Sequence, residues 1–442
     1  MPQIAAARGL QARSGLANHP VRRPLQAVGG TTALRKIDLS FLRDARWFGT
    51  ERAVGYAKVL LVAYIPGLLI CYCGMIGRIG SDYLAYWSAA QIALHGNPAG
   101  AYDNPTQSAF QQALGRPYFF PFLYPPPFLA LVLPFGLLPY AVSLPVWVAS
   151  TFAAYLATAR IIMKQAFWPI AAFSAVYVNA SYAQNGFVTA SLFIGGVLAL
   201  ERRPFVAGLV FGALVIKPHL AVLIPVALVA ARQWRAFAGA ALSSIGLLAA
   251  SLAAFGEPTT LAYLHRAATS ASLLAGDQTH IKVIASLLPK TPSAFAVARV
   301  FGAPESLALA AQLAVSGALA ILVWRVWSGP GEILAKGAVL ASTAVLATPY
   351  LLDYDMVLLI LPICWLAREG LRRGFYPWEK PMLAIAYAMP FIGQVTTAVA
   401  GMNLALFSSL MLLWMVLRRW RETLRDERAR RARVAGVSAA TA

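Results

Sequence analysis

The chain has 442 residues, of which 59% are hydrophobic and only 12% are Asp, Glu, Lys or Arg. Its mean hydropathy is +0.64, and a soluble globular domain carries about twice that share of charge. The composition therefore excludes a water-soluble globule. A net charge of +20 would suggest nucleic-acid binding in a soluble protein, but here its placement indicates a membrane orientation, and no nucleic-acid partner is expected.

Residues 1–55 form a basic leader. The part before Lys36 is rich in Ala, Gly and Arg with little apolar periodicity, so we expect a disordered tail without a cleavable signal peptide. In residues 36–48 apolar residues recur at helical spacing between charges. This pattern predicts an interfacial amphipathic helix, with a solvated linker as the alternative.

Apolar runs near the length that crosses a bilayer, about 20 residues, recur through residues 56–418. In chain order they are 56–77, 129–138, 141–163, 166–182, 186–200, 205–216, 220–231, 236–255, 306–327, 337–348, 356–367, 381–399 and 404–417. Two long polar segments, 78–127 and 256–305, are predicted loops. The alternation typical of a β-barrel is absent, so the predicted fold is an all-α polytopic membrane protein.

Both ends of the chain are basic. The leader up to Arg52 holds nine Lys/Arg against three acids, and residues 418–442 hold eight against three. The positive-inside rule places both termini in the cytoplasm, including a basic tail at 419–442, and requires an even number of spans. The shortest run, 129–138, is flanked by prolines and is predicted to be a re-entrant or surface helix, which leaves about twelve spans in the inner (plasma) membrane.

One alternative topology stays open in the middle of the chain. The two runs within 205–231 are short for two spans. If that stretch crosses once and 129–138 also crosses, the total is unchanged but the middle of the topology inverts.

Ionisable residues avoid the centres of the predicted spans and gather on the outer side. This distribution argues against ion-coupled transport and favours chemistry at the outer surface. The first outer loop opens with a helix signal, in which Ser81 is the N-cap and Gly96 the stop. Asp82 then lies at a helix N-terminus, where the dipole keeps it ionised and able to accept a proton from a hydroxyl. The alternative is that Asp82 only supports the helix start, and for Asp103 we favour such capping.

Polar and aromatic residues elsewhere on the outer side suit a lipid-linked substrate. The aromatic cluster that ends at Tyr124 predicts either anchoring at the bilayer interface or a wall for a lipid-linked substrate. Lys217-Pro218-His219 interrupts an apolar stretch, so Lys217 must meet an anion such as phosphate, or else snorkel to a headgroup.

Two further outer segments carry candidate binding groups. In the second outer loop, Gln278, His280 and Lys282 suit a sugar or a phosphate. Near the next outer turn, Tyr350, Asp353 and Asp355 predict first a polar turn between spans and second a sugar-binding wall.

The sequence predicts no cofactor and no metal site. The cysteines lack metal-ligand spacing, and the Asp-x-Asp form of residues 353–355 is too short a match to indicate a metal. A divalent ion held by Asp82 with Asp353 or Asp355 is left open.

Short motifs in a fixed order resemble glycosyltransferase family 87, integral membrane enzymes of the GT-C superfamily. They are Asp82-Tyr83 with Tyr86-Trp87 and Ala89-Ala90, Gly96 with Tyr102-Asp103, Tyr124-Pro125-Pro126, Gln184-Asn185-Gly186, Lys217-Pro218, the Gln278 loop, and Pro349 leading to Asp353 and Asp355. The resemblance spans residues 82–417. Family members often have Asn-Gln-Ser where this chain has Asp277-Gln278-Thr279, so a mannose assignment does not follow.

This resemblance implies a GT-C-type bundle of about twelve transmembrane helices with its active site at the extracytoplasmic face. Asp82 matches the general base, and the donor implied is a hexose, mannose-like, on a polyprenyl phosphate, transferred with inversion to a lipid or glycan acceptor. Lys217, His219, Gln278, His280, Lys282, Tyr350, Asp353 and Asp355 are the candidate donor-binding residues, and Tyr83, Tyr86, Trp87 and Tyr124 the acceptor or lipid wall. The alternatives are a lipid-linked sugar flippase without transfer chemistry and a non-catalytic scaffold.

Overall fold

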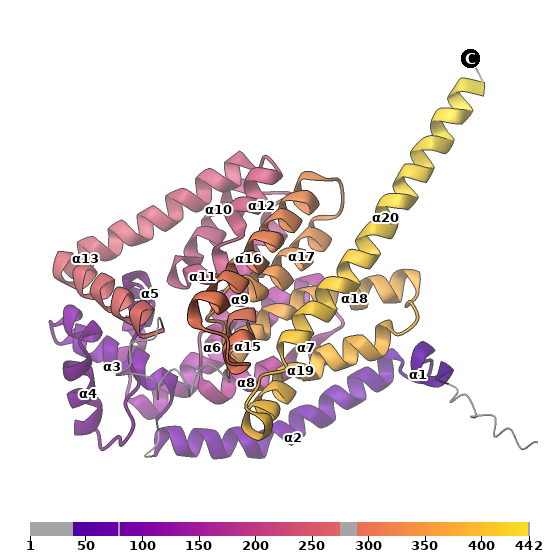
Figure 1. Ribbon diagram of the computed structural model, residues 1–442. Coiled ribbons are helices and arrows are strands. Elements are labelled where there is room, and N and C mark those ends of the chain that lie inside the picture. Colours follow the sequence, from indigo (N-terminus) through magenta and orange to yellow (C-terminus); the bar gives the residue numbers. More distant parts are fainter. Residues whose placement is uncertain (1–38, 78–79, 275–289, 441–442) are drawn as a thin grey trace, which may run out of the picture. The chain divides into compact units, whose positions relative to one another are not determined.

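The structure is a computed structural model that describes residues 39–77, 80–274 and 290–440, without the side chains of 270–274 and 426–440. Every regular element in these ranges is an α-helix or a 3₁₀-helix, which confirms the predicted all-α class (Figure 1). Ser40–Ala442 form one compact unit. The residues before it lie outside the described part, and so does the predicted tail.

The first half of the unit contains both long and short helices. In chain order they are α1 (Ser40–Asp44), α2 (Thr50–Ile76), α3 (Asp82–Leu94), η1 (Pro98–Tyr102), α4 (Asn104–Ala113), α5 (Pro126–Gly136), α6 (Tyr140–Ile162), α7 (Phe167–Ala171), α8 (Ser174–Tyr182), α9 (Gly186–Ala199), α10 (Pro204–Gly212), η2 (Ala213–Ile216), α11 (Pro218–Ala221) and α12 (Ile224–Ala230).

The second half is built mainly from long helices. They are α13 (Trp234–Leu274), α15 (Ala294–Val300), α16 (Glu305–Ser328), α17 (Ile333–Leu346), η5 (Asp353–Leu359), α18 (Ile360–Arg373), α19 (Glu379–Ala400) and α20 (Leu406–Ala440).

Five helices among the described residues are long and apolar enough to cross a membrane: α2, α6, α13 up to Thr269, α16 and α19. They give the protein its membrane character. Five further apolar stretches, such as α9 with 14 residues, are shorter than the roughly 20 residues that a single crossing requires. The count of about twelve spans therefore remains a prediction.

Three predicted apolar runs are broken rather than continuous. The run 166–182 forms α7 and α8, because Phe173 between them has extended backbone angles (φ −54°, ψ 130°). The run 205–216 tightens from α10 into η2. The run 220–231 divides between α11 and α12, and Pro225 lies at the start of α12, where a missing N–H costs no hydrogen bond.

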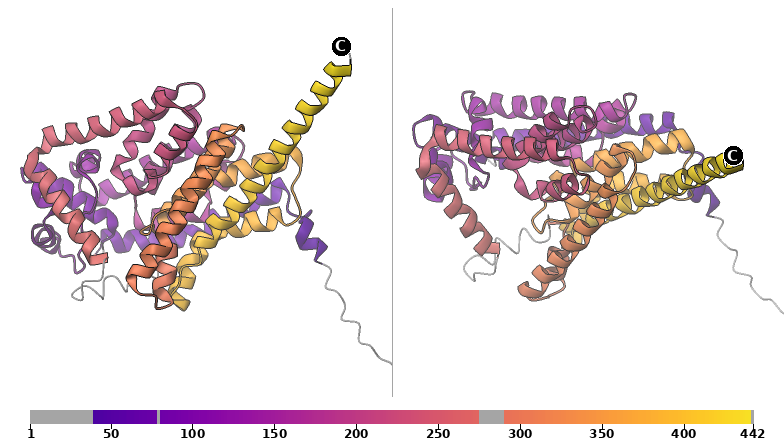
Figure 2. Two further views of the ribbon diagram at one scale, coloured as in Figure 1. Left: turned by 45° about the horizontal axis from the view of Figure 1, so that its top comes forward. Right: turned by 90° about the horizontal axis from the view of Figure 1, so that it is seen from above.

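The two predicted outer loops contain helices among their described residues, including the helix expected after Ser81, so their description as long loops is not confirmed. The segment 78–127 contains α3, η1 and α4. The segment 256–305 begins inside α13, which turns at Gly256 (φ +79°) and continues as a second helical arm (Figure 2). Polar composition did not exclude helices, and the candidate span in α13 extends to Thr269, inside the second segment.

The amphipathic helix predicted over residues 36–48 is only five residues long in the structure. α1 ends at Asp44, and Ala45 takes a left-handed backbone conformation (φ +39°) that stops the helix. The Nζ of Lys380 then donates to the carbonyls of Ala45 and Phe48, and the N–H of Trp378 donates to the carbonyl of Arg43. A helix through residue 48 is therefore wrong because these carbonyls are bound by the start of α19.

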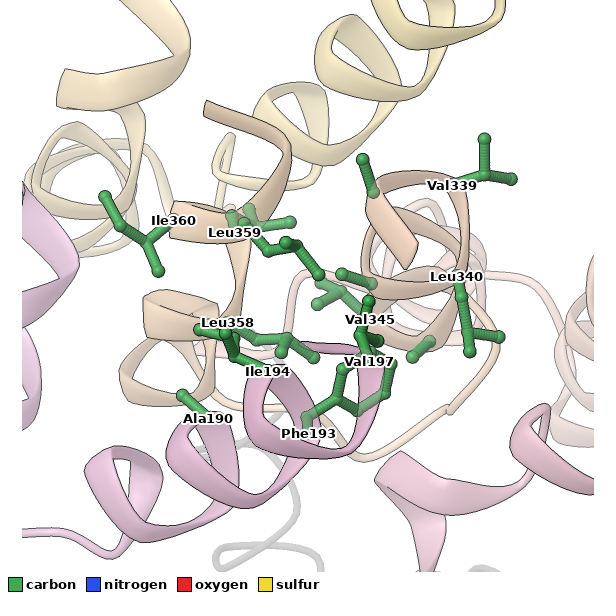
Figure 3. Packing of buried hydrophobic residues seen from close by; sticks show 14 of the residues in the cluster. Ala190, Phe193, Ile194, Val197, Val339, Leu340, Val345, Leu358, Leu359 and Ile360 are labelled. Atoms are coloured by element: carbon green, nitrogen blue, oxygen red, sulfur yellow. The ribbon is translucent and has the colours of Figure 1, made fainter. Parts of the chain in front are cut away.

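The main apolar core joins α9 to α17 and to the η5–α18 segment (Figure 3). From α9 come Ala190, Phe193, Ile194 and Val197, which meet Val339, Leu340 and Val345 of α17 and Leu358, Leu359 and Ile360. A Cβ on Gly337 of α17 would collide with the side chain of Val197, so these two helices touch closely. This core fixes the start of α9 against the start of η5, which is where the polar cluster described below lies.

A second close contact joins α10 to α13 through glycine. A Cβ on Gly208 or Gly212, four residues apart on α10, would collide with the backbone of Ala236 or Ala240 on α13, and Gly239 approaches α10 equally closely. Such small-xxx-small stripes let helix backbones pack tightly where lipid offers no hydrophobic gain. This contact holds the first arm of α13 beside the segment that leads to Lys217.

Candidate active site

Asp82 is the first residue of α3, as the sequence predicts. The Oγ of Ser81 accepts a hydrogen bond from the N–H of Tyr83 at 3.2 Å, which confirms Ser81 as the N-cap. The helix ends at Leu94, and Gly96 beyond it has φ +85°, as expected for a helix stop. Asp103 caps α4 by accepting from the N–H of Thr106 at 3.0 Å, so its predicted capping role is also confirmed.

Gln184 holds the carboxylate of Asp82. Its Nε2 donates to the Oδ2 of Asp82 at 2.7 Å. Its Oε1 accepts from the hydroxyl of Tyr124 at 3.1 Å, from the N–H of Asn185 at 3.2 Å, and from the hydroxyl of Tyr86. Because donors surround the Oε1, the amide can only present its N–H to Asp82. The orientation of this side chain is therefore determined by the network.

Lys217 lies between η2 and α11, at the predicted helix break. Its Nζ donates to the Oδ1 of Asp355 at 2.5 Å and to the Oδ1 of Asn185 at 3.0 Å. The ring of Tyr354 lies 5.0 Å from this ammonium group and adds a cation–π contact. The buried cation is thus compensated by a carboxylate and an amide, as burial of a charge requires.

The start of η5 supplies the carboxylate partner. Asp353, Tyr354 and Asp355 are all buried there. The Nδ2 of Asn179 donates to the carbonyl of Tyr354 at 3.3 Å, and a Cβ on Gly186 would lie 2.7 Å from that same oxygen. Only glycine at position 186 therefore lets the start of α9 approach η5 closely enough to bring Lys217 to Asp355.

Burial dominates the electrostatics of the three acids. It raises the pKa of Asp82 above its usual value, against the lowering effects of the Gln184 hydrogen bond and the charges of Lys217 and Lys290. It raises the pKa of Asp353 to about 6 and raises the pKa of Asp355, where Lys217 opposes the shift. The argument from the helix dipole did not include this desolvation, so the ionised state of Asp82 stays a prediction.

The structure thus joins residues from five separate segments of the chain into one cluster, and Asp82, Tyr86, Tyr124, Lys217 and Asp355 among them were predicted site residues. We define the Asp82–Lys217 cluster as Asp82, Tyr86, Tyr124, Gln184, Asn185, Lys217, Tyr354 and Asp355. The hydroxyls of Tyr86 and Tyr124 lie 2.9 Å apart, and both bind Gln184. Polar atoms in the cluster can accept a proton, hold an anion and bind hydroxyl groups.

Two predicted wall residues direct their polar atoms elsewhere. The hydroxyl of Tyr83 lies 2.5 Å from the Oγ of Ser143, and the Nε1 of Trp87 donates to the carbonyl of Leu138 at 2.9 Å. Both rings are buried and connect α3 to α6 and to the end of α5. Their role as an acceptor wall stays a prediction, whereas their part in packing α3 is visible.

The remaining predicted residues are not joined to the cluster by any hydrogen bond in the described residues. Burial and the charge of Lys217 lower the pKa of His219 to about 3, so its imidazole is neutral and cannot serve as a cation. Tyr350 is 41% exposed and packs against Phe295, with ring centroids 6.0 Å apart. Gln278, His280 and Lys282 lie outside the described residues.

Gln184 and Asn185 are the functional candidates that reasoning from residue types missed. They entered only as part of a motif that resembles a family. A local signal was present, since two amides follow one another between two apolar runs, where an unpaired polar group is costly. Ala183 before them adopts a left-handed conformation (φ +52°), which ends α8 and turns both amides into the cluster.

The described residues contain no group of three His, Cys, Asp or Glu side chains that could hold a metal ion. One oxygen of Asp355 is engaged by Lys217, which competes with any cation there.

Comparison with known proteins gives one match. No curated protein and no solved structure matches the chain. The family model described as Glycosyltransferase family 87 matches residues 122–349, more than half of the chain, and this range includes Gln184 and Lys217 but not Asp82 or Asp355. The chain therefore belongs to glycosyltransferase family 87 and is a membrane glycosyltransferase.

Proposed function

We propose that the protein transfers a hexose, mannose-like, from a polyprenyl-phosphate donor to a lipid or glycan acceptor at the extracytoplasmic face of the inner (plasma) membrane. Both termini are then cytoplasmic. The observation that carries this proposal is the joining of Asp82 to Lys217 through Gln184 and Asn185, which follow one another in the chain. A proton acceptor and an anion-binding cation thus share one network.

In the proposed reaction, Asp82 acts as the general base. One carboxylate oxygen removes the proton of an acceptor hydroxyl while the hydroxyl oxygen attacks the anomeric carbon of the donor sugar. The bond from that carbon to the phosphate oxygen breaks, and the polyprenyl phosphate leaves with the electron pair. Attack opposite the leaving group inverts the anomeric centre. Asp82 is partly exposed, so a hydroxyl can reach it, whereas its neighbour Tyr83 is fully buried.

Lys217 is the candidate that holds the leaving phosphate. An ammonium group has three N–H donors, and Lys217 uses two of them among the described residues, toward Asp355 and Asn185. The third is available for a phosphate oxygen, on which negative charge increases as the glycosidic bond breaks. Asp355 fixes the position of the ammonium group, and Tyr354 covers it.

Gln184 is a positioning residue in this scheme. It donates to Asp82 and is itself held by the two tyrosine hydroxyls. Donation of a hydrogen bond favours the ionised carboxylate and partly offsets the desolvation that raises the pKa of Asp82. This hydrogen bond therefore favours the ionised form of the base, whereas desolvation favours the protonated form.

Aromatic rings lie beside the cluster. Tyr86, Phe122 and Phe128 are buried and pack with Tyr124 edge to face, tilted or stacked, with centroids 4.5–6.4 Å apart. Tyr118 and Phe119, just before them, are exposed. Such rings suit the polar boundary of a bilayer, where a prenyl chain meets a phosphate and a sugar.

The test is product formation by purified protein in lipid nanodiscs supplied with polyprenyl-phosphate hexoses and a membrane lipid extract, followed by mass spectrometry. We expect new glycolipid from the wild type and about a 10²–10⁴-fold loss for Asp82→Asn, since this is the typical contribution of a general base. Asp103→Asn is the matched control, because Asn preserves a helix cap in the same segment.

Two results would overturn the proposal. One is retained turnover in folded Asp82→Asn, which would remove Asp82 from the mechanism. The other is movement of intact sugar-lipid across the bilayer of liposomes that contain the protein, without any glycosidic product, which would identify a flippase.

A further inference from the structure

A cavity lies at the opposite ends of the helices that carry the Asp82–Lys217 cluster. Its volume is about 750 Å³, and it is lined by Leu200, Val229–Trp234, Trp324, Trp327–Gly329, Ile333 and Lys336. Asn185 directly precedes α9 and Leu200 directly follows it, so 14 residues, or about 21 Å of helix, separate the cavity from the cluster. The cavity is therefore a separate site.

Two membrane-length helices place this cavity at the depth of lipid headgroups. α13 begins at Trp234 and α16 ends at Ser328, and both residues line the cavity. The α12–α13 and α16–α17 connections lie at the same edge of the unit, and α12 contacts α16 (Figure 1). Because spans end where hydrocarbon meets headgroups, we infer that the cavity lies near the polar boundary of the bilayer.

The polar lining is cationic and lacks an acid. Arg232 and Lys336 line the cavity, no Asp or Glu does, and neither cation forms an ion pair within the described ranges. Lys336 donates to the carbonyls of Gly329 at 2.6 Å and Trp327 at 3.3 Å, so its ammonium group is held in place with one donor to spare. Glu332 nearby is bound instead by Arg368 and by the Nε1 of Trp365.

Tryptophans form the apolar wall. Trp324 and Trp234 are 48% and 58% exposed, whereas Trp327 is buried and donates its N–H to the carbonyl of Lys336 at 3.2 Å. Indole rings prefer the interface between hydrocarbon and water. A ligand here would meet two cations at its polar end and two exposed indoles at its apolar end.

We propose that this cavity binds the phosphate headgroup of an anionic phospholipid, with its acyl chains against Trp234 and Trp324. Charge selects the occupant, since unpaired cations without an acid favour an anionic over a zwitterionic headgroup. The volume is within the usual range for small-molecule sites, about 300–1,000 Å³. This proposal is independent of the transfer chemistry. It does not depend on which sugar the enzyme transfers.

The experiment is native mass spectrometry of the full chain in detergent, titrated with phosphatidylglycerol, phosphatidylcholine or inorganic phosphate. We expect phosphatidylglycerol to bind about tenfold more tightly than phosphatidylcholine, and Arg232→Gln to weaken phosphatidylglycerol binding about fivefold, the usual effect of one cation at a lipid surface. Arg232→Lys should restore most of the affinity. Arg202→Gln, an exposed cation at a neighbouring turn that does not line the cavity, should change nothing.

Three outcomes would overturn the proposal. Equal retention of the two lipids would exclude charge selection, and unchanged binding in Arg232→Gln would place the lipid elsewhere. Inorganic phosphate that binds as tightly as phosphatidylglycerol would identify a soluble anion as the ligand. Melting temperatures of the variants show that each is folded, so loss of binding is not loss of structure.

Discussion

Two buried ion pairs, Lys217–Asp355 and Arg419–Glu379, differ in how fully they are hydrogen-bonded. All four side chains are at most 4% exposed. Arg419 binds both carboxylate oxygens of Glu379 and the carbonyl of Gly374, and Glu379 also accepts from the N–H of Tyr376 at 2.9 Å. This pair joins the start of α19 to α20 and has every bond that a structural pair needs.

The Lys217–Asp355 pair is incomplete by comparison. Lys217 touches one oxygen of Asp355, and the neighbouring Asn185 Nδ2, Asn179 Oδ1 and His219 Nε2 are buried without partners among the described residues. Buried polar groups without partners are costly, and in the proposed function a bound substrate would supply the missing hydrogen bonds. The two ion pairs are therefore equally buried but differ in how many of the nearby polar atoms have hydrogen-bond partners.

The largest expected effect is on stability, from Arg419→Met. Removal of one partner leaves Glu379 buried and uncompensated, and this typically costs about 3–5 kcal/mol. We expect a strong loss of folded protein, measured as melting temperature and detergent-stable yield, whereas any folded fraction should keep normal turnover. Arg421→Met, an exposed cation two residues further along α20, is the control. A selective loss of turnover in stable Arg419→Met would contradict the assignment of this pair to the fold.

Lys217→Met should instead reduce turnover. Loss of one charged donor at a leaving group is expected to slow transfer about 10²–10³-fold. Burial already raises the pKa of Asp355, so without Lys217 this carboxylate can take up a proton and become neutral. The loss of stability is therefore limited. Initial rates and melting temperature, measured together, separate these effects, and Lys217→Arg should recover part of the rate. Turnover within threefold of the wild type would exclude Lys217 from phosphate binding.

Gln184→Leu sharpens the comparison through its pH dependence. The Gln184 N–H lowers the pKa of Asp82, so its removal raises that pKa, and the base is ionised only at higher pH. We expect about a tenfold loss of kcat/KM at neutral pH that recovers as the pH rises, because the acid limb of the profile follows the pKa of the base. The control is Gln111→Leu, which replaces a buried glutamine that is hydrogen-bonded to Ser88 and Phe120. It should not shift the acid limb of the pH profile. An unshifted limb in Gln184→Leu would show that Gln184 does not tune the base.

The smallest effect is expected for Arg368, which is partly buried and pairs with the exposed Glu332. It also lies 3.4 Å from the buried Glu369, but Arg372 and Arg373 pair with that acid as well. Glu332 is 43% exposed, so solvent screens its charge, and Arg368→Gln should cost less than about 1 kcal/mol. Denaturation in detergent measures this difference. If Arg368→Gln lowers the free energy of unfolding as much as Arg419→Met does, burial of an ion pair does not determine its contribution to stability in this protein.

Local patterns accounted for part of the fold. The cap at Ser81, the helix stop at Gly96 and the break at Lys217-Pro218 all depend on residues within a few positions of one another, and each appears in the structure. The continuous run predicted over 166–182 does not appear as one helix, because apolar composition cannot show that Phe173 leaves the helical conformation. The helix starts after Ser81 and Asp103 were expected in the first outer loop, but η1 in that loop and the second arm of α13 were not.

The candidate site was likewise only partly predictable from the sequence. Sequence identified Asp82, Lys217 and Asp355 as separate residues of interest, but the pairing of Lys217 with Asp355 joins positions 138 residues apart. The roles of Gln184 and Asn185 depend on which groups surround them after folding. The shift in the pKa of Asp82 also required knowledge of its burial.

By itself, the sequence determined that this is a helical membrane protein, that α3 begins at Asp82 and that the chain breaks at Lys217, because hydropathy, capping and proline act over short distances. The tertiary structure alone decided which donor holds Asp82, which carboxylate neutralises Lys217 and which cations stay unpaired around the distant cavity. These contacts depend on the packing of α9 against α17 and η5, where Gly186 and Gly337 permit close approach, and no local pattern specifies such a meeting of distant segments.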